Sequence, residues 1–96
     1  MATFIVLNNF TDQGIRNVKE TRKRAEALRE MAKKHGVTVR EVFWTLGTCD
    51  VVVIFDAPSD EAMTTLGLAM GQLGNVRTQT LRAYSDSEMK GILAKL

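Results

Sequence analysis

The chain has little of what disulfide-stapled, disordered or membrane-spanning proteins require. It contains one cysteine and one proline in 96 residues, so an intrachain disulfide and a low-complexity composition are both excluded. The lone cysteine favours a reducing cytoplasm. The longest apolar run, Val51–Phe55, is far shorter than the roughly 20 residues that cross a bilayer. No basic leader precedes the first apolar segment, so neither a signal peptide nor a membrane partner is expected.

The chain is also poor in residues that perform catalysis or hold metals. His35 and Cys49 are the only histidine and the only cysteine. A zinc site needs about four ligands with close spacing, and a serine hydrolase needs a Gly-x-Ser-x-Gly turn. A thiolate nucleophile would need His35 beside Cys49, and the sequence leaves their separation open. We therefore assign no catalytic residue, no metal and no cofactor, although an enzymatic role stays open.

Charge is distributed unevenly along the chain. Residues 16–34 hold eight Lys/Arg and three Glu, whereas the formal net charge of the whole chain is only +2. Glu30 lies three and four residues before Lys33 and Lys34, a spacing typical of a solvated helix face. A nucleic-acid surface is the alternative interpretation. We favour the solvated face and expect no specific nucleic-acid partner.

Periodicity and turn residues predict an α+β domain. One predicted helix ends at His35-Gly36, and a second begins at Ser59 or Asp60; both alternate with strands. Asn8-Asn9 is interpreted as the end of the first strand, and Thr11–Gly14 as a turn. The connection between the second and third strands is too short for a crossover, so that pair is an antiparallel hairpin. The predicted strands are 3–9, 37–46, 51–55 and 76–84, and the predicted helices end near 34 and 73. This βαββαβ order is the ferredoxin-like arrangement with a four-stranded antiparallel sheet.

The last residues predict a short helix outside this arrangement. Ser85 and Glu88 form a capping box, and an apolar stripe follows, made of Met89, Ile92, Leu93 and Leu96. We divide the chain into a ferredoxin-like domain, residues 1–84, and a C-terminal helical tail, residues 85–96.

The strands are apolar on both faces, although two helices can cover only one. Val51–Phe55 is apolar throughout, and strict alternation predicts Val39 and Phe43 on one face of their strand and Val42 and Trp44 on the other. A second copy's sheet is the simplest cover for the remaining face. We therefore expect a homodimer in the form of a dimeric α+β barrel, or a higher homo-oligomer. Gly67 and Gly71, four residues apart, predict close packing of the second helix on the sheet.

Several segments resemble one known family. The resemblance is carried by Trp44–Gly47, Asp50–Val52, Ala57–Glu61, Gly74–Ala83 and, after the first strand, Thr11–Asn17. These segments are similar to the GYD-domain family, and the similarity extends from about residue 3 to residue 84. The resemblance implies a ferredoxin-like fold that pairs as a dimeric α+β barrel, and it implies little about activity. In the Gly-Tyr-Asp position of the hairpin, Cys49 stands where the family's tyrosine is expected, between Gly47 and Asp50.

The last predicted strand is unusually polar. Alternation puts Thr78, Thr80 and Arg82 on one face and Arg77 on the other. Together with Trp44, these side chains are candidates for binding an anionic or polar aromatic ligand. Alternatively, the polar groups of this strand pair with Asp50, Asp56 or Glu41, either across the sheet or across the dimer.

The functional hypothesis from sequence is a small homodimeric barrel that binds a small polar or anionic molecule at the sheet–sheet cavity. One alternative is a cofactor-independent monooxygenase or isomerase, which rests on fold analogy alone. The other is a structural or interaction module.

Overall fold

The computed structural model describes all 96 residues and confirms the α+β prediction. The elements are β1 (Ala2–Phe10), α1 (Asp12–Arg16), the 3-10 turn η1 (Val18–Glu20), α2 (Thr21–Lys34), β2 (Thr38–Trp44), β3 (Val51–Ala57), α3 (Asp60–Gln72), β4 (Val76–Ala83) and α4 (Asp86–Leu93). The four strands form one antiparallel sheet in the order β2-β3-β1-β4. None of the helices is both long enough and apolar enough to span a membrane.

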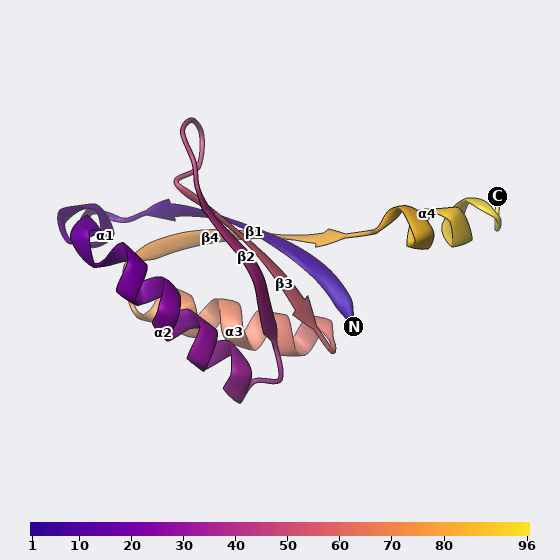
Figure 1. The fold of residues 1–96 in the computed structure, drawn as a ribbon, viewed down its shortest axis with the longest axis horizontal. Coiled ribbons are helices and arrows are strands. Elements are labelled where there is room, and N and C mark those ends of the chain that lie inside the picture. The colour runs from indigo at the N-terminus through magenta and orange to yellow at the C-terminus, as the bar shows by residue number, and fades with distance from the viewer.

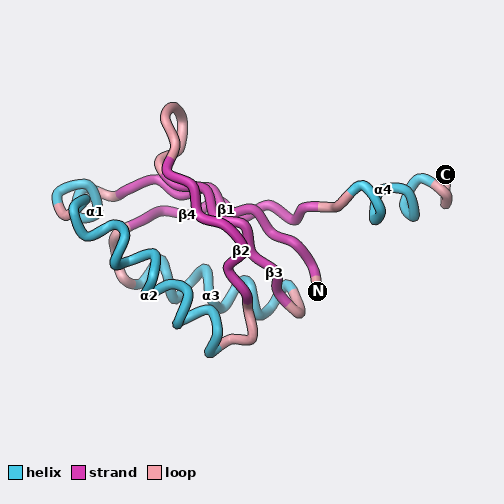
Figure 2. Tube along the Cα trace, in the orientation of Figure 1, coloured by secondary structure: helices cyan, strands magenta, loops and turns pink.

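Helices α2 and α3 both lie on one face of the sheet (Figure 1, Figure 2). The core between these layers takes alternate residues of the central strands, including Val6 of β1 and Phe55 of β3. From the helices, Ala32 and Leu66 reach complete burial. Alternation sends every second strand residue into this layer, and the apolar side chains there are removed from water.

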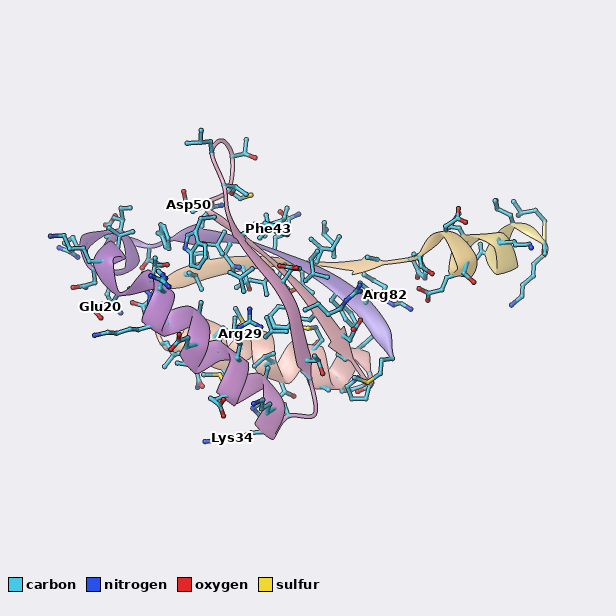
Figure 3. All side chains as sticks on the ribbon, viewed as in Figure 1. Glu20, Arg29, Lys34, Phe43, Asp50 and Arg82 are labelled. Carbon is cyan, nitrogen blue, oxygen red and sulfur yellow. The ribbon has the colours of Figure 1, made fainter.

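The other face of the sheet is apolar and is covered by no part of the chain. The strand pairing puts Ile5 opposite both Ile54 and Leu81, and it puts Phe43 opposite Val52. Phe43 is 50% exposed and Leu81 is 41% exposed. Phe43 lies on the side of the sheet away from the helices (Figure 3). We refer to Ile5, Leu7, Phe43, Val52, Ile54 and Leu81 as the open sheet face. Dimerisation through this face remains a prediction.

Strand β2 contains an irregularity that strict alternation could not predict. Its register with β3 shifts between Val39 and Glu41, so that an extra residue, Arg40, is inserted. Because of this extra residue, the side chains of β2 after the bulge point to the opposite face of the sheet from the one that strict alternation predicts. Val39 and Val42 consequently pack against the same core, and their predicted placement on opposite faces is wrong.

Strand β1 also runs further than predicted. Asn8 and Asn9 do not end it, because both pair with β4 and the strand continues to Phe10. As a central strand, β1 is hydrogen-bonded on both sides, and that pairing outweighs the low β-propensity of asparagine. The segment after it, predicted as a turn, forms the short helix α1, which is capped by the Thr11 hydroxyl accepting from the Gly14 amide at 3.0 Å.

The predicted helix ends are confirmed. Gly36 and Gly74 take the positive φ angles of +71° and +81° that end α2 and α3. The Ser59 hydroxyl caps α3, and Ser85 with Glu88 forms the capping box of α4. Helix α4 lies at the end of an extended segment, away from α2 and α3 (Figure 1). Its apolar stripe is exposed, with Leu93 at 54%. Leu96, predicted as part of this stripe, is 98% exposed and lies beyond the end of the helix.

The basic segment is an exposed helix face with interleaved charges. Lys23 lies 3.4 Å from Glu20, and Lys33 lies 3.4 Å from Glu30. Arg29 donates to the Val39 carbonyl at 3.3 Å and so links α2 to β2. Glu20, Arg29 and Lys34 are labelled along this helix in Figure 3. These exposed pairs of opposite charge confirm the prediction that the basic segment is a solvated helix face.

Candidate functional site

Three of the predicted ligand-binding residues lie together in one groove. Thr78, Thr80 and Arg82 pair with Asn8, Val6 and Phe4, whose side chains are buried on the helix-covered face of the sheet. With Asp60, Met63, Thr64, Gly67 and Leu68 of α3, and with Phe4, they line a groove of about 410 Å³. We refer to it as the α3–β4 groove. It lies on the opposite side of the sheet from the open sheet face, so these residues would not line a sheet–sheet cavity.

Gly67 contributes to the openness of this groove. A Cβ atom built on Gly67 or on Gly71 would meet no other atom within 4 Å. The two glycines therefore do not serve close packing of α3 on the sheet, and that prediction is wrong. Gly67 instead lines the α3–β4 groove, as does Thr80 of the edge strand β4.

Trp44 and Arg77 lie elsewhere. Trp44 is on β2, at the opposite edge of the sheet from β4, and its indole N–H donates to the Thr21 hydroxyl at 3.0 Å. Arg77 pairs with Asn9 and points to the side of the open sheet face. The five predicted residues therefore do not form a single site, because strands β3 and β1 separate Trp44 from Arg82.

Arg82 is held by several groups of this chain. Its guanidinium donates to the carbonyls of Thr3, at 3.4 Å, and Ala83, and it lies 3.3 Å from the Glu88 carboxylate. It also stacks over the Tyr84 ring, 4.5 Å from its centroid. The backbone hydrogen bond from Ser85, followed by the bond from Arg82, holds the pKa of Glu88 below its usual range.

The carboxylate that Arg82 meets within this chain is not one of those suggested from sequence, whereas pairing across a dimer stays a prediction. Arg82 pairs with Glu88 rather than with Asp50, Asp56 or Glu41. Asp56 lies 3.5 Å from Arg40, and it accepts from the Thr3 hydroxyl at 3.3 Å. Alternation along the strands could not reveal Glu88, because this residue lies beyond the end of β4.

Asp50 has a role in the backbone that sequence reasoning missed. Its carboxylate accepts from the Phe10 amide at 2.9 Å, and its own amide donates to the Asn8 carbonyl at 2.8 Å. It thereby fixes the base of the β2–β3 hairpin to the end of β1. Gly47 at φ +112° makes the turn, and Leu46 beside it is fully exposed. The one available signal was that Asp50 belongs to the segments resembling a known family.

The segment after β1, Thr11–Gln13, is hydrogen-bonded to the segment before β4, Gly74–Asn75. We refer to these two hydrogen-bonded segments as the clasp. The Thr11 amide donates to the Asn75 carbonyl at 3.1 Å, and the Gln13 side chain donates to the Asn75 side chain at 2.9 Å. The Thr11 hydroxyl also donates to the Gly74 carbonyl at 2.5 Å. Both segments carry the family resemblance, and their contact gives a structural reason for the two motifs occurring together.

His35 and Cys49 lie at opposite ends of β2. His35 precedes this seven-residue strand and Cys49 follows it. An extended strand of that length separates its ends by about 20 Å, too far for a nucleophile and its base. The Cys49 sulfur instead lies 3.6 Å from the Thr45 hydroxyl. No group of three or more His, Cys, Asp or Glu side chains is placed to hold a metal ion.

Fold and surface together define a small ferredoxin-like α+β domain with an uncovered sheet face, a protruding hairpin and a projecting terminal helix. The chain matches the GYD domain over residues 4–93 and belongs to that family, which confirms the resemblance seen in its motifs. It is 33% identical over 90 residues to a protein of Thermus thermophilus named glutamine synthetase and cystathionine beta-lyase binding protein. The alignment covers 93% of this chain and 95% of that relative.

Proposed function

We propose that this protein is a homodimeric binding protein whose partners are metabolic enzymes. The observation that carries this proposal is the amount of apolar surface that the chain leaves uncovered, on the open sheet face and on α4. Contiguous exposed apolar surface on a small domain marks an interaction site. The relative's name, which records binding to glutamine synthetase and cystathionine beta-lyase, supports an enzyme as the partner. A cytoplasmic location belongs to the same proposal.

The two apolar surfaces serve different contacts in this proposal. The open sheet face packs against the open sheet face of a second copy, because two antiparallel sheets can pack face to face and bury alternate residues of both. Helix α4 projects away from the body and exposes the apolar residues Met89, Ile92 and Leu93. A helix of eight residues is marginal by itself in water, so it gains stability by laying its stripe into a groove of the enzyme.

The test is direct binding to the two enzymes purified from the same organism as this chain. We expect titration calorimetry to give a dissociation constant in the micromolar range for at least one of them. Leu93→Ser should weaken that binding about tenfold or more, because the stripe loses an apolar anchor. Lys90→Ser, on the same helix outside the stripe, is the matched control and should leave the affinity within about twofold. Absence of binding to both enzymes would overturn the proposal.

A small polar or anionic molecule in the α3–β4 groove is the second candidate function. It is favoured by the presence of Arg82, Thr78 and Thr80 in one groove. The alternative of a cofactor-independent enzyme has no comparable observation in its favour, because His35 and Cys49 are far apart.

Arg82→Leu and Arg77→Leu test this second candidate as a pair. The side chains of Arg82 and Glu88 are 31% and 39% exposed, so breaking their ion pair should cost at most about 1 kcal/mol. If the groove holds an anion, Arg82→Leu should abolish the rise in melting temperature that phosphate or benzoate produces. Arg77→Leu, on the other side of the sheet, should retain it. The absence of any effect of these anions on the unmodified protein would exclude the candidate.

A further inference from the structure

Strand β4 leaves one edge of the sheet unpaired. It is the last strand in the order β2-β3-β1-β4, and its eight residues pair with β1 alone, in one continuous register. Neither a proline nor a bulge interrupts it. An edge of this kind offers a row of backbone N–H and C=O groups to a further strand.

The hydrogen bonds of β1 show which backbone groups of β4 point outward. The Asn8 carbonyl bonds on the β3 side, to the Asp50 amide. Backbone groups alternate in direction along a strand, so Asn9 bonds on the β4 side, with its partner Arg77. The same alternation turns the backbone groups of every second β4 residue outward, and these residues are Val76, Thr78, Thr80 and Arg82.

These outward groups are free within the chain. Apart from its ladder with β1, the β4 backbone receives a single hydrogen bond, from the Arg82 guanidinium to the Ala83 carbonyl. The free part of the edge therefore extends along β4 up to Arg82.

The other edge strand, β2, is obstructed. Its register shifts at Arg40, and from α2 the Arg29 side chain donates to the Val39 carbonyl at 3.3 Å. Bulges and charged side chains are the usual means by which edge strands avoid further pairing. Strand β4 is therefore the edge at which this sheet can be extended.

The α3–β4 groove gives room for the side chains of an added strand. Thr78 and Thr80, whose backbone groups point outward, also line this groove. On α3, Leu68 lines it and is 69% exposed, and a Cβ on Gly67 would meet nothing within 4 Å. Alternate side chains of a strand added beside β4 point to this side of the sheet, where Leu68 offers an apolar contact.

The charges along β4 differ between its two sides. On the groove side, Asp60 and Arg82 carry opposite charges, which favours uncharged residues in an added strand. On the other side, the Arg77 side chain is exposed and forms no ion pair within the chain. An acidic residue directly opposite Arg77 would therefore be attracted to it.

We propose that the β4 edge binds an extended peptide segment of a partner protein, which pairs antiparallel to β4 as a fifth strand. Antiparallel pairing is the more stable arrangement. Backbone hydrogen bonds hold the segment, its groove-side residues are apolar, and an acidic residue lies opposite Arg77. This contact requires neither α4 nor the Arg82 guanidinium, so it is distinct from enzyme docking through α4 and from anion binding in the groove.

The probe is the peptide acetyl-Ser-Thr-Val-Thr-Val-Glu-Thr-amide. In the antiparallel register its two valines lie opposite Thr80 and Thr78, and its glutamate lies opposite Arg77. We expect it to shift the backbone amide signals of β4 in proton–nitrogen NMR, with a dissociation constant on the order of 0.1–1 mM. Absence of shifts at millimolar peptide, or shifts confined to other elements, would overturn the proposal.

N-methylated peptides test the backbone pairing without altering the protein. Methyl groups on the two valine amides remove the donors to the Thr80 and Thr78 carbonyls, so binding should weaken about tenfold or more. Methyl groups on the second and fourth residues, both threonines, point away from β4 and should leave the affinity within about threefold. Equal effects of the two modifications would contradict pairing as a fifth strand.

An exchange of charges tests the acidic position. Arg77→Glu should weaken binding of the probe about threefold, and a peptide with lysine in place of its glutamate should recover the loss. Failure of the lysine peptide to recover it would overturn the proposed register.

Thr80→Pro is the decisive change in the protein. Proline lacks an N–H and is tolerated in an edge strand where that group faces solvent, so the pairing of β4 with β1 is kept. Peptide binding should fall about tenfold or more, whereas Thr80→Val, which keeps the amide, should bind within about threefold of the unmodified protein. Unchanged binding in Thr80→Pro would overturn the proposal. If this variant fails to fold, the N-methylated peptides decide the same question on the unmodified protein.

Discussion

Gly14→Ala is expected to destabilise the fold by about 2–3 kcal/mol or more, because it forces a methyl group into the backbone of the clasp. A Cβ on Gly14 would lie 2.0 Å from the Asn75 carbonyl oxygen and 2.9 Å from its carbonyl carbon. These are backbone atoms, and the same oxygen accepts from the Thr11 amide. Relief of the clash therefore requires α1 or the start of β4 to move. Urea denaturation followed by circular dichroism measures the loss.

Gly71→Ala is the matched control, since Gly71 also lies inside a helix. A Cβ there meets nothing within 4 Å, so the substitution should stabilise α3 by about 0.5–1 kcal/mol through helix propensity. Equal stability of Gly14→Ala and the unmodified protein would show that the clasp is looser than the contact between Gly14 and Asn75 indicates.

Ile54→Asp is expected to dissociate the proposed dimer. Ile54 lies within the open sheet face, on β3 between Ile5 of β1 and Glu41 of β2. In a twofold symmetric pair the substitution acts in both copies, each time placing a carboxylate against apolar surface. Light scattering should give about twice the 10.7 kDa chain mass for the unmodified protein. The variant should give a single chain mass, with the dissociation constant raised about 100-fold or more.

Thr65→Asp introduces the same charge on the exposed side of α3 and should leave the dimer intact. A monomeric unmodified protein at micromolar concentration would contradict the face-to-face pairing. The enzyme-binding proposal would then have to use the open sheet face itself, and Ile54→Asp rather than Leu93→Ser would become the variant that weakens it.

The sequence alone was enough to predict most of the elements and their order. Gly36, Ser59 and the Ser85-Glu88 pair end or begin helices through short-range hydrogen bonds and backbone conformation, which depend on neighbouring residues only. The β2–β3 hairpin follows from the shortness of its connection. The facing of Thr78, Thr80 and Arg82 against Arg77 follows from the period of a strand without a bulge.

Only the tertiary structure decided which of these residues meet. Trp44 and Arg82 lie on opposite edge strands because β3 and β1 occupy the centre of the sheet, and the local pattern of neither edge strand specifies its neighbours. Asn8 continues a strand instead of ending it because that strand is paired on both sides. The bulge at Arg40 and the pairing of Arg82 with Glu88 likewise depend on residues distant in sequence or outside the strand. Short-range interactions therefore determined the elements, whereas packing between distant segments determined the site.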